Sequence, residues 1–165
     1  MTHVLETGFE ILNRENPNGS PTVIGYNIIN GELRPASDGK TFESRNPAWL
    51  DDCLGVFPLS TKNDVHDALI SAREAFSQWS QTPAPTRGQI IGNMGRLLME
   101  HKDDIVRVEA REIGKTLKES AGEVQEAIDT CLFFQSEGRR LYGQTVNSEL
   151  PDKELFTYRR PLGVC

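Results

Sequence analysis

The side chains that could act as nucleophiles, general bases or metal ligands are few and widely spaced. The three cysteines and three histidines of the chain are Cys53, Cys131, Cys165, His3, His66 and His101. An odd number of cysteines at irregular intervals argues against a disulfide framework, and against a zinc site, which needs closely paired ligands. No histidine has an acid or a nucleophile at a spacing typical of a catalytic pair. We therefore predict that the cysteines are core residues, that the histidines are solvated or cap helices, and that no catalytic residue is present.

Two further patterns invite a functional interpretation. Glutamates gather in one stretch, at Glu109, Glu112, Glu119, Glu123 and Glu126. An acid–base or metal site is one interpretation, but a solvated helix face explains the same pattern, and we favour it. Three glycines, Gly88, Gly92 and Gly95, lie inside a helical pattern and not in a GxGxxG loop after a strand. We expect them to let helices pack closely, and we predict no cofactor-binding residue.

The first third of the chain has the pattern of short strands. Asn30 and Gly31, flanked by apolar residues, are the strongest short hairpin signal, because both positions of a type I′ turn need a positive φ. Residues 41–45 alternate between apolar and polar and end at an Asn-Pro turn, which predicts a strand. Residues 54–59 predict another, and Pro58 places it at the edge or the end of a sheet.

Apolar residues then recur with the helical period, and four helices are expected. Thr61 followed by Asp64 is a start signal of the capping-box kind, and Pro83 ends the first helix. The second is expected to start at Thr86. The predicted inward residues of these two helices are Val65, Ala68, Leu69, Ala72, Phe76 and Trp79, then Ile90, Ile91, Met94, Leu97 and Leu98.

The third helix is predicted over residues 102–113, with Gly114 as its stop. The fourth is predicted to continue to Gly143, and residues 155–160 to form a final strand. The residues expected along the inner face of the fourth helix are Leu117, Ala121, Val124, Ile128, Cys131, Gln135 and Tyr142.

Composition places the chain among soluble globular proteins. It has 165 residues and a formal net charge of −6, with acids and bases mixed along the sequence. There is no basic stripe to neutralise phosphates, so nucleic acid is not an expected partner. The apolar runs are too short to span a membrane, and acids stand where a signal peptide needs positive charge, so we expect a cytoplasmic protein. The residues alone predict an α+β chain with no visible active site.

The stretch from Tyr26 onward resembles the aldehyde dehydrogenase superfamily. The motifs that carry the resemblance are Asn27-Ile28-Ile29-Asn30-Gly31-Glu32, Phe42-Glu43-Ser44-Arg45-Asn46-Pro47-Ala48, Leu54-Gly55-Val56-Phe57-Pro58-Leu59, Glu112-Ile113-Gly114-Lys115-Thr116-Leu117 and Tyr158-Arg159-Arg160-Pro161-Leu162-Gly163. Ile113 and Thr116 replace the commoner Thr and Pro, which leaves the subfamily open. The resemblance implies an α/β fold, truncated here before most of a Rossmann-like sheet.

The resemblance also implies an activity. Members of the superfamily oxidise an aldehyde with NAD or NADP: a cysteine thiolate attacks the carbonyl, hydride leaves to the nicotinamide, and a glutamate activates water. In the family's order all of these residues lie beyond position 165, so Cys165 is not the nucleophile. We expect this chain alone to be inactive and to bind no cofactor. Some members hold a structural cation, which would lie here at the backbone oxygens of Ser44 and Arg45 and the carboxylate of Glu112; a carboxylate bonded to backbone amides is the alternative.

The resemblance divides the chain into an arm (1–22), the N-terminal part of the cofactor-binding domain (23–150), an oligomerisation strand (151–161) and the start of another strand (162–165). It implies a homo-oligomer formed through residues 155–160. Two alternatives stay open. A standalone helical interaction module would seal its apolar stripes internally, whereas part of an enzyme would expose them. A semialdehyde or acyl-phosphate type of the same superfamily would differ only in its product.

Overall fold

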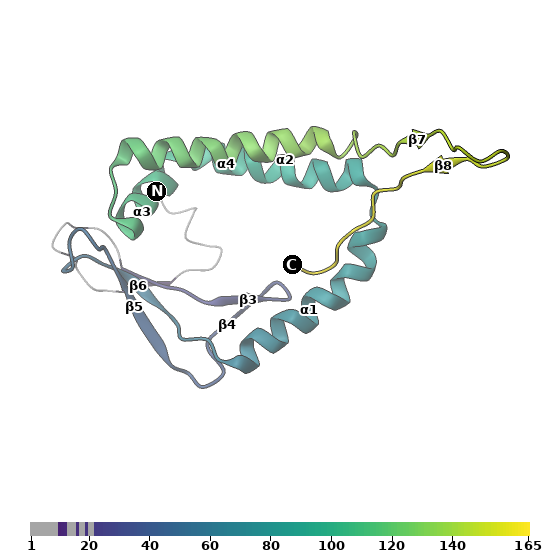
Figure 1. Ribbon diagram of the computed structural model, residues 1–165. Helices are drawn as coiled ribbons and strands as arrows, with labels where there is room; N and C mark the ends of the chain where they lie inside the picture. Colours follow the sequence, from purple (N-terminus) through teal and green to yellow (C-terminus); the bar gives the residue numbers. More distant parts are fainter. Residues whose placement is uncertain (1–9, 13–15, 17–18, 20–21) are drawn as a thin grey trace.

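The structure, a computed structural model, describes residues 10–12, 16, 19 and 22–165. Its elements are β1 (Glu10–Leu12), β2 (Thr22–Ile24), β3 (Asn27–Ile29), β4 (Glu32–Arg34), β5 (Thr41–Arg45), β6 (Cys53–Pro58), α1 (Lys62–Gln81), α2 (Ala84–Glu100), α3 (Lys102–Ile113), α4 (Leu117–Glu137), β7 (Thr145–Val146) and β8 (Leu155–Phe156). Strands lie on one side and the α2–α4 pair on the other (Figure 1). Helices α3 and α1 connect these two layers at opposite ends, which confirms the predicted mixture of strands, four helices and a final strand.

The main sheet has the strand order β1-β2-β6-β5. Strand β6 runs parallel to β2 and antiparallel to β5, so it is central, and Pro58 marks its end and not an edge. The two strands predicted around residues 41–45 and 54–59 are thus confirmed. The separate β3–β4 hairpin turns at Asn30 and Gly31, with φ of 54° and 75°, as the type I′ prediction requires.

The first 22 residues are not wholly an arm outside the core. Asn16 and Thr22 are buried, and β1 pairs with β2. The Asn16 amide donates to the Cys53 carbonyl (2.8 Å) and accepts from the Cys53 N–H (3.0 Å), so it does what a neighbouring strand would do. The expectation fails at these positions because a polar side chain can replace a backbone partner. The rest of that range, apart from residues 10–12 and 19, lies outside the described residues.

Helix α1 starts as predicted. Asp64 accepts from the Thr61 N–H (2.6 Å), and the Thr61 hydroxyl caps the first turn. Asp64 also accepts from the Ser37 N–H (3.0 Å), which ties the helix to the loop after β4. The helix ends at Gln81, before Pro83.

Two helix ends differ from the prediction. Helix α2 begins at Ala84 and not at Thr86, since proline is well accommodated in a first turn, where no N–H is needed. Helix α4 ends at Glu137 and not at Gly143. Gly138 follows it at a point where a Cβ would lie 2.5 Å from the Ala84 carbonyl oxygen, so the chain turns where the two helices meet. Helix α3 ends as predicted, with Gly114 at φ 75°.

Glycines make the contact between α2 and α4. Gly88, Gly92 and Gly95 are the buried residues of α2, which confirms their predicted packing role. A Cβ on Gly88 would lie 2.5 Å from the Gln135 carbonyl oxygen, and one on Gly95 2.8 Å from the Cys131 Cβ. The glycine stripe therefore faces α4, because only that side allows the backbones to approach.

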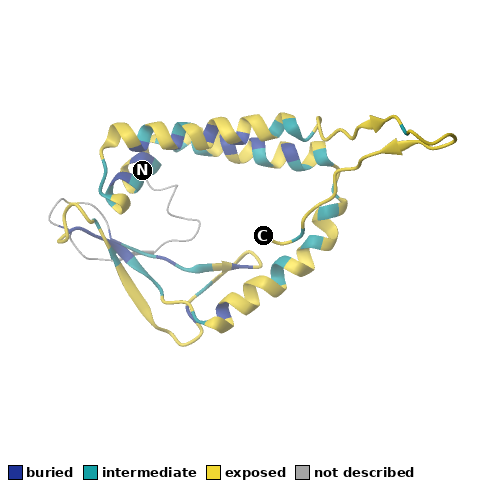
Figure 2. Ribbon diagram, viewed as in Figure 1, coloured by how far each residue is buried: buried dark blue, intermediate teal, exposed yellow. Residues whose placement is uncertain are grey.

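The predicted apolar faces are largely uncovered. Val106, Val124 and Ile128 form the small helical core, with Leu98, Ile105 and Ala121 packed against it. Other residues predicted to point inward are exposed in the chain as it stands: Val65, Leu69, Trp79, Ile90, Met94, Leu97, Leu117 and Tyr142. Figure 2 shows how little of α1 is buried. The inward orientation is not realised at these positions, because no element among the described residues covers those sides.

The ribbon after α4 extends away from the rest of the molecule (Figure 1). Its strands β7 and β8 pair antiparallel, with Thr145 opposite Phe156. The predicted strand over 155–160 is regular only over Leu155–Phe156, and β7 was not predicted. Cys165, predicted to be a core residue, is exposed.

Gly88→Ala should destabilise the protein, although alanine normally favours a helix by about 1 kcal/mol over glycine. The added methyl group would meet the backbone of α4, and overpacking of this kind costs about 1–3 kcal/mol. Gly122→Ala in α4 is the matched control, since nothing lies within 4 Å of its Cβ position. Urea unfolding should show opposite signs for the two variants; equal signs would contradict the proposed packing.

Hydrogen bonds from the Thr61 backbone and hydroxyl and from Ser37 hold the pKa of Asp64 below its ordinary value, against the opposing effect of burial. The ionised Asp64 carboxylate therefore stabilises the fold above the ordinary aspartate pKa of about 3.9. This stabilisation is lost as pH falls through the lower pKa that Asp64 has in the folded state. Asp64→Ala should lower the urea midpoint most near neutral pH, and the deficit should shrink in acid. Asp67→Ala, at an exposed position of the same helix, should show no such trend.

Candidate functional site

A buried ion pair joins the strands to the helices. Asp52, fully buried at the end of the loop before β6, accepts two hydrogen bonds from the Arg111 guanidinium of α3, at 2.7 Å and 3.0 Å. Arg111 is 20% exposed, so most of the fork is shielded from water. Asn46 adds a third hydrogen bond to the Asp52 carboxylate at 3.2 Å. The carboxylate is thus held in place by its neighbours and is not presented to a ligand.

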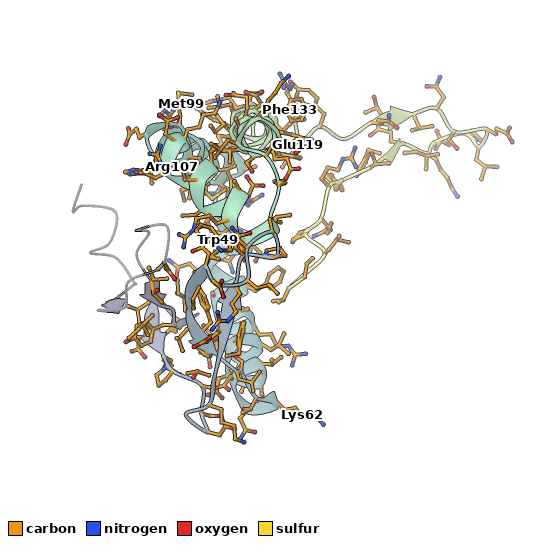
Figure 3. The ribbon with its side chains drawn as sticks, turned by 90° about the vertical axis from the view of Figure 1, so that its left-hand side faces the viewer. Trp49, Lys62, Met99, Arg107, Glu119 and Phe133 are labelled. Atoms are coloured by element: carbon orange, nitrogen blue, oxygen red, sulfur yellow. The ribbon has the colours of Figure 1, made fainter. Side chains whose placement is uncertain are left out.

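The loop between β5 and β6 is fitted against the end of α3. The Asn46 N–H donates to the Asp52 carbonyl (3.0 Å), which closes the loop on itself. A Cβ on Gly114 would lie 2.8 Å from the Pro47 ring, so the left-handed turn after α3 leaves room for this loop. In Figure 3, Trp49 lies between the strands and the helices. This corner fixes how the two layers meet.

A second polar cluster surrounds Lys115, between α3 and α4. Its ammonium group donates to Glu109 (2.8 Å) and to Glu123. The hydrogen bonds to Glu109 and then Glu123 raise the pKa of Lys115, and the one from Lys115 lowers the pKa of Glu123. Glu119 forms a capping box with Thr116, whose hydroxyl and N–H lower the pKa of the Glu119 carboxyl.

The five glutamates therefore have three roles. Glu112 and Glu126 are exposed, as expected for a solvated face, Glu109 and Glu123 bind Lys115, and Glu119 caps α4. Within the described residues, no group of three or more His, Cys, Asp and Glu could hold a metal ion. The sequence pattern did not reveal Lys115 as the centre of the cluster, because its partners come from two different helices.

The thiols and imidazoles do not form a catalytic pair in the described part of the chain. Cys53 and Cys131 are buried, as predicted. His66 is exposed on α1, and His101 lies at the junction of α2 and α3, both as predicted; His3 is outside the described residues.

The residues predicted for a structural cation lie on neighbouring elements. Ser44 and Arg45 are at a register irregularity of β5, and Glu112 is in the last turn of α3, which contacts β5. Arg45 donates to the Leu50 carbonyl (2.9 Å) and pairs with Glu43.

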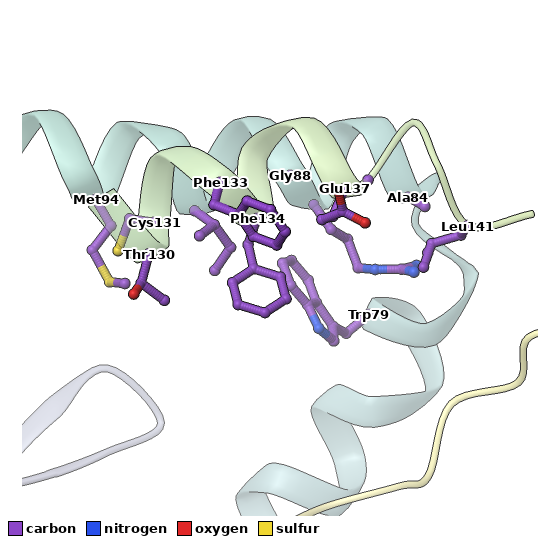
Figure 4. Close-up of a pocket in the computed structure, with 13 residues that line it drawn as sticks. Trp79, Ala84, Gly88, Met94, Thr130, Cys131, Phe133, Phe134, Glu137 and Leu141 are labelled. Atoms are coloured by element: carbon purple, nitrogen blue, oxygen red, sulfur yellow. The ribbon is translucent and has the colours of Figure 1, made fainter. Parts of the chain in front are cut away.

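An apolar groove lies between the end of α1 and the α2–α4 pair (Figure 4). Its volume is about 560 Å³. The residues that line it include Trp79, Met94, Cys131, Phe133, Phe134 and Leu141. Arg87, also in its wall, donates to the Thr82 carbonyl. The groove offers mainly aromatic and aliphatic surface, with Glu137 and Arg87 as its charged residues, so it is suited to an apolar contact. Sequence analysis missed it because adjacent aromatics such as Phe133 and Phe134 do not follow one helical stripe.

The glycines of α2 do not form a binding loop for a dinucleotide cofactor. A pyrophosphate needs backbone N–H groups freed by glycines at a helix start. The helical glycines that could be considered, Gly88, Gly92 and Gly95, face α4 at van der Waals distance or closer. Among the described helices, none is long and apolar enough to cross a membrane.

Comparisons with known proteins point to one family. The sequence profile of the aldehyde dehydrogenase family matches residues 34–165. The chain is 36% identical to the α-ketoglutarate semialdehyde dehydrogenase of Haloferax volcanii, over 84% of this chain and 29% of the relative. It is 36% identical to the succinate-semialdehyde dehydrogenase [NADP(+)] of Escherichia coli, over 83% and 28%.

Solved structures agree. A crystal structure of an NADP-dependent enzyme from E. coli superposes with a TM-score of 0.74 at 35% identity, covering 79% of this chain and 27% of that one. Apo betaine aldehyde dehydrogenase from Staphylococcus aureus gives a TM-score of 0.76 at 28% identity, covering 82% and 27%. The chain spans less than a third of the length of these proteins.

Arg111→Gln should destabilise the protein by about 3–5 kcal/mol, because it leaves the buried Asp52 carboxylate without its counter-ion. Arg107→Gln is the matched control on the same helix. Arg107 pairs with Asp104 at an exposed position, where such a pair contributes at most about 1 kcal/mol. Chemical unfolding measures the free energy of unfolding of both variants. Similar losses would show that the Asp52–Arg111 pair stabilises the protein no more than an exposed pair does.

Proposed function

Because this chain belongs to the aldehyde dehydrogenase family, we propose that it forms the N-terminal portion of an enzyme that oxidises an aldehyde to a carboxylate with NAD or NADP, through a cysteine thiohemiacetal. The observation that carries the proposal is the family match over residues 34–165, supported by the superposition on solved dehydrogenases. The cysteine, the base and the cofactor site of such an enzyme would lie outside this chain. What the chain itself contributes is a scaffold.

The names of the relatives favour one class of aldehyde. They include α-ketoglutarate, succinate and malonate semialdehyde dehydrogenases, at 34–36% identity. Each of these names describes an aldehyde that carries a carboxylate on the same carbon chain. We therefore propose a semialdehyde of a small dicarboxylic acid as the substrate of the complete enzyme.

The chain alone is proposed to be inactive. A thiol nucleophile needs an adjacent base and donors for the oxyanion. Two of the thiols are buried, and the Cys165 thiol is near the Gly163 carbonyl oxygen (3.9 Å), which is an acceptor and not a base for this chemistry.

The exposed apolar sides of α1 and α2 support a scaffold role over the alternative of a standalone helical module. Val65, Leu69 and Leu97 are between 46% and 56% exposed, whereas an independent module would cover such a stripe. In a complete enzyme we expect the remaining polypeptide to cover these sides.

Four other expectations belong to this proposal. They are a homo-oligomer formed through residues 155–160, a structural cation at Ser44, Arg45 and Glu112, the assignment of residues 23–150 to the N-terminal part of the cofactor-binding domain, and a cytoplasmic location. Of these, the oligomer has the most structural support, because the β7–β8 ribbon extends from the molecule with both faces exposed.

Purified residues 1–165 should form no NAD(P)H from succinate semialdehyde, measured by ultraviolet absorbance. A chimera in which this chain replaces the corresponding N-terminal segment of the E. coli succinate-semialdehyde dehydrogenase should be active. The E. coli protein without that segment is the negative control. Turnover by the isolated chain, or a soluble but inactive chimera with the parent's oligomeric state, would contradict the proposal.

A further inference from the structure

The β3–β4 hairpin turns on an Asn-Gly pair, the dipeptide in which an asparagine side chain is most open to attack by the next backbone nitrogen. Asn30 and Gly31 are both exposed, and nothing lies within 4 Å of the position that a Cβ on Gly31 would take. A glycine lets its own nitrogen approach the Asn30 side chain closely, because it has no side chain of its own. The two groups that would react are therefore unhindered and open to water.

Neither reacting group is held elsewhere by a hydrogen bond. The ladder of the hairpin closes at Ile29 and Glu32, so the Gly31 N–H lies outside it. Among the residues that the structure describes, none accepts from the Gly31 N–H, and none pairs with the Asn30 side-chain amide. The nitrogen can therefore approach the amide carbon without breaking an existing bond.

The turn already sets one of the two backbone torsions of Asn30 that ring closure needs. Its φ of 54° is that of the first turn residue in types I′ and II′ alike, about +60°. A five-membered ring places Cβ and the next nitrogen on the same side of the Cα–C bond, which for an L-residue means the type II′ ψ of about −120°. The two turns differ by a rotation of the Asn30–Gly31 peptide unit, both join strands by two residues, and Gly31 tolerates either sign of φ. The ring can therefore close while β3 and β4 stay paired.

A second dipeptide that could form such a ring, Asp38-Gly39, shows what holds the reaction back. The Gly39 N–H donates to the Ala36 carbonyl (2.8 Å), so its nitrogen is already engaged. The Asp38 carboxylate accepts from the Lys40 N–H (3.0 Å) and pairs with the Lys40 ammonium group (2.9 Å). The hydrogen bond from the Lys40 backbone lowers the pKa of Asp38, which keeps the carboxylate ionised and a poor target for a nucleophile.

We propose that Asn30 is a site of spontaneous covalent modification in the folded protein. The Gly31 nitrogen attacks the Asn30 Cγ and forms a C–N bond, the Cγ–Nδ2 bond breaks, and ammonia leaves with the proton that the nitrogen gave up. Water then opens the resulting succinimide at Cγ, which gives aspartate, or at the backbone carbonyl carbon, which gives isoaspartate. The net reaction consumes one water and exchanges an amide for a carboxylate, so no oxidant or reductant takes part.

The products would change how the hairpin is held. The backbone of isoaspartate runs through Cβ, so one extra methylene group lies between β3 and β4, and the turn no longer joins them in register. Either product also adds a negative charge beside the hollow between the hairpin and α1, which Ile29, Asp67 and Glu74 line together with Arg34. Ile29 is the buried residue of β3. Modification of Asn30 therefore loosens the contact of the hairpin with α1.

Peptide mapping of the full chain tests the proposal. Purified protein is kept for days at neutral pH and physiological temperature, folded in buffer or unfolded in guanidinium chloride. Chymotrypsin, which cleaves after Tyr26, separates residue 30 from the other Asn-Gly pair of the chain, Asn18-Gly19. The peptide with residue 30 should gain the mass of an amide-to-carboxylate exchange at least as fast in the folded chain as in the unfolded one. The physical reason is that the hairpin already holds Asn30 at the φ of the ring.

Asn30→Gly is the matched control, since Gly-Gly also suits a type I′ turn and removes the reacting amide. This variant should show no mass gain at residue 30, and the peptide with Asp38 should stay free of isoaspartate in the folded wild type. An unchanged Asn30, slower loss of its amide in the folded chain than in denaturant, or equal isoaspartate at position 38 would overturn the proposal. None of these measurements involves an aldehyde, so their outcome and that of the chimera are independent.

Discussion

The close approach of α2 and α4 is the contact on which the other parts of the structure depend. It exists because three glycines on one side of α2 let the two backbones meet. With that distance set, Val124 and Ile128 reach Val106 and close the small helical core. The same contact positions the walls of the aromatic groove, and Gly138 ends α4 where the ribbon leaves the body.

Local signals in the sequence predicted the local structure well. The hairpin at Asn30 and Gly31, the capping box of Thr61 and Asp64, and the stop at Gly114 each depend on residues that are neighbours in the chain. Contacts between distant residues escaped prediction. Asp52 and Arg111 are 59 positions apart, and nothing in either segment identifies the other as its partner.

The apolar stripes show a different limit of sequence reasoning. Periodicity indicates that a helix side is meant to be covered, but not by what. On α1 the stripe was found, yet Val65 and Leu69 are exposed because no described element of the chain covers them. For the candidate site, the sequence predicted only that no catalytic pair is formed, because the thiols and imidazoles are not spaced as such a pair would be. The Lys115 cluster and the groove depend on how helices are arranged, which composition does not encode.

The hydrogen bonds of Asn16 show that the part of the chain that folds together is longer than the part that matches the family profile. The family profile begins at residue 34, but the backbone of Cys53 in the central strand is satisfied by an amide 37 positions earlier. A boundary drawn at residue 34 would remove Asn16, which bonds the Cys53 N–H and carbonyl, together with β2, and so leave one side of β6 without its hydrogen-bond partners. Domain boundaries for expression or for evolutionary comparison in this protein are therefore better drawn upstream of Asn16, where hydrogen bonding and not homology sets the limit.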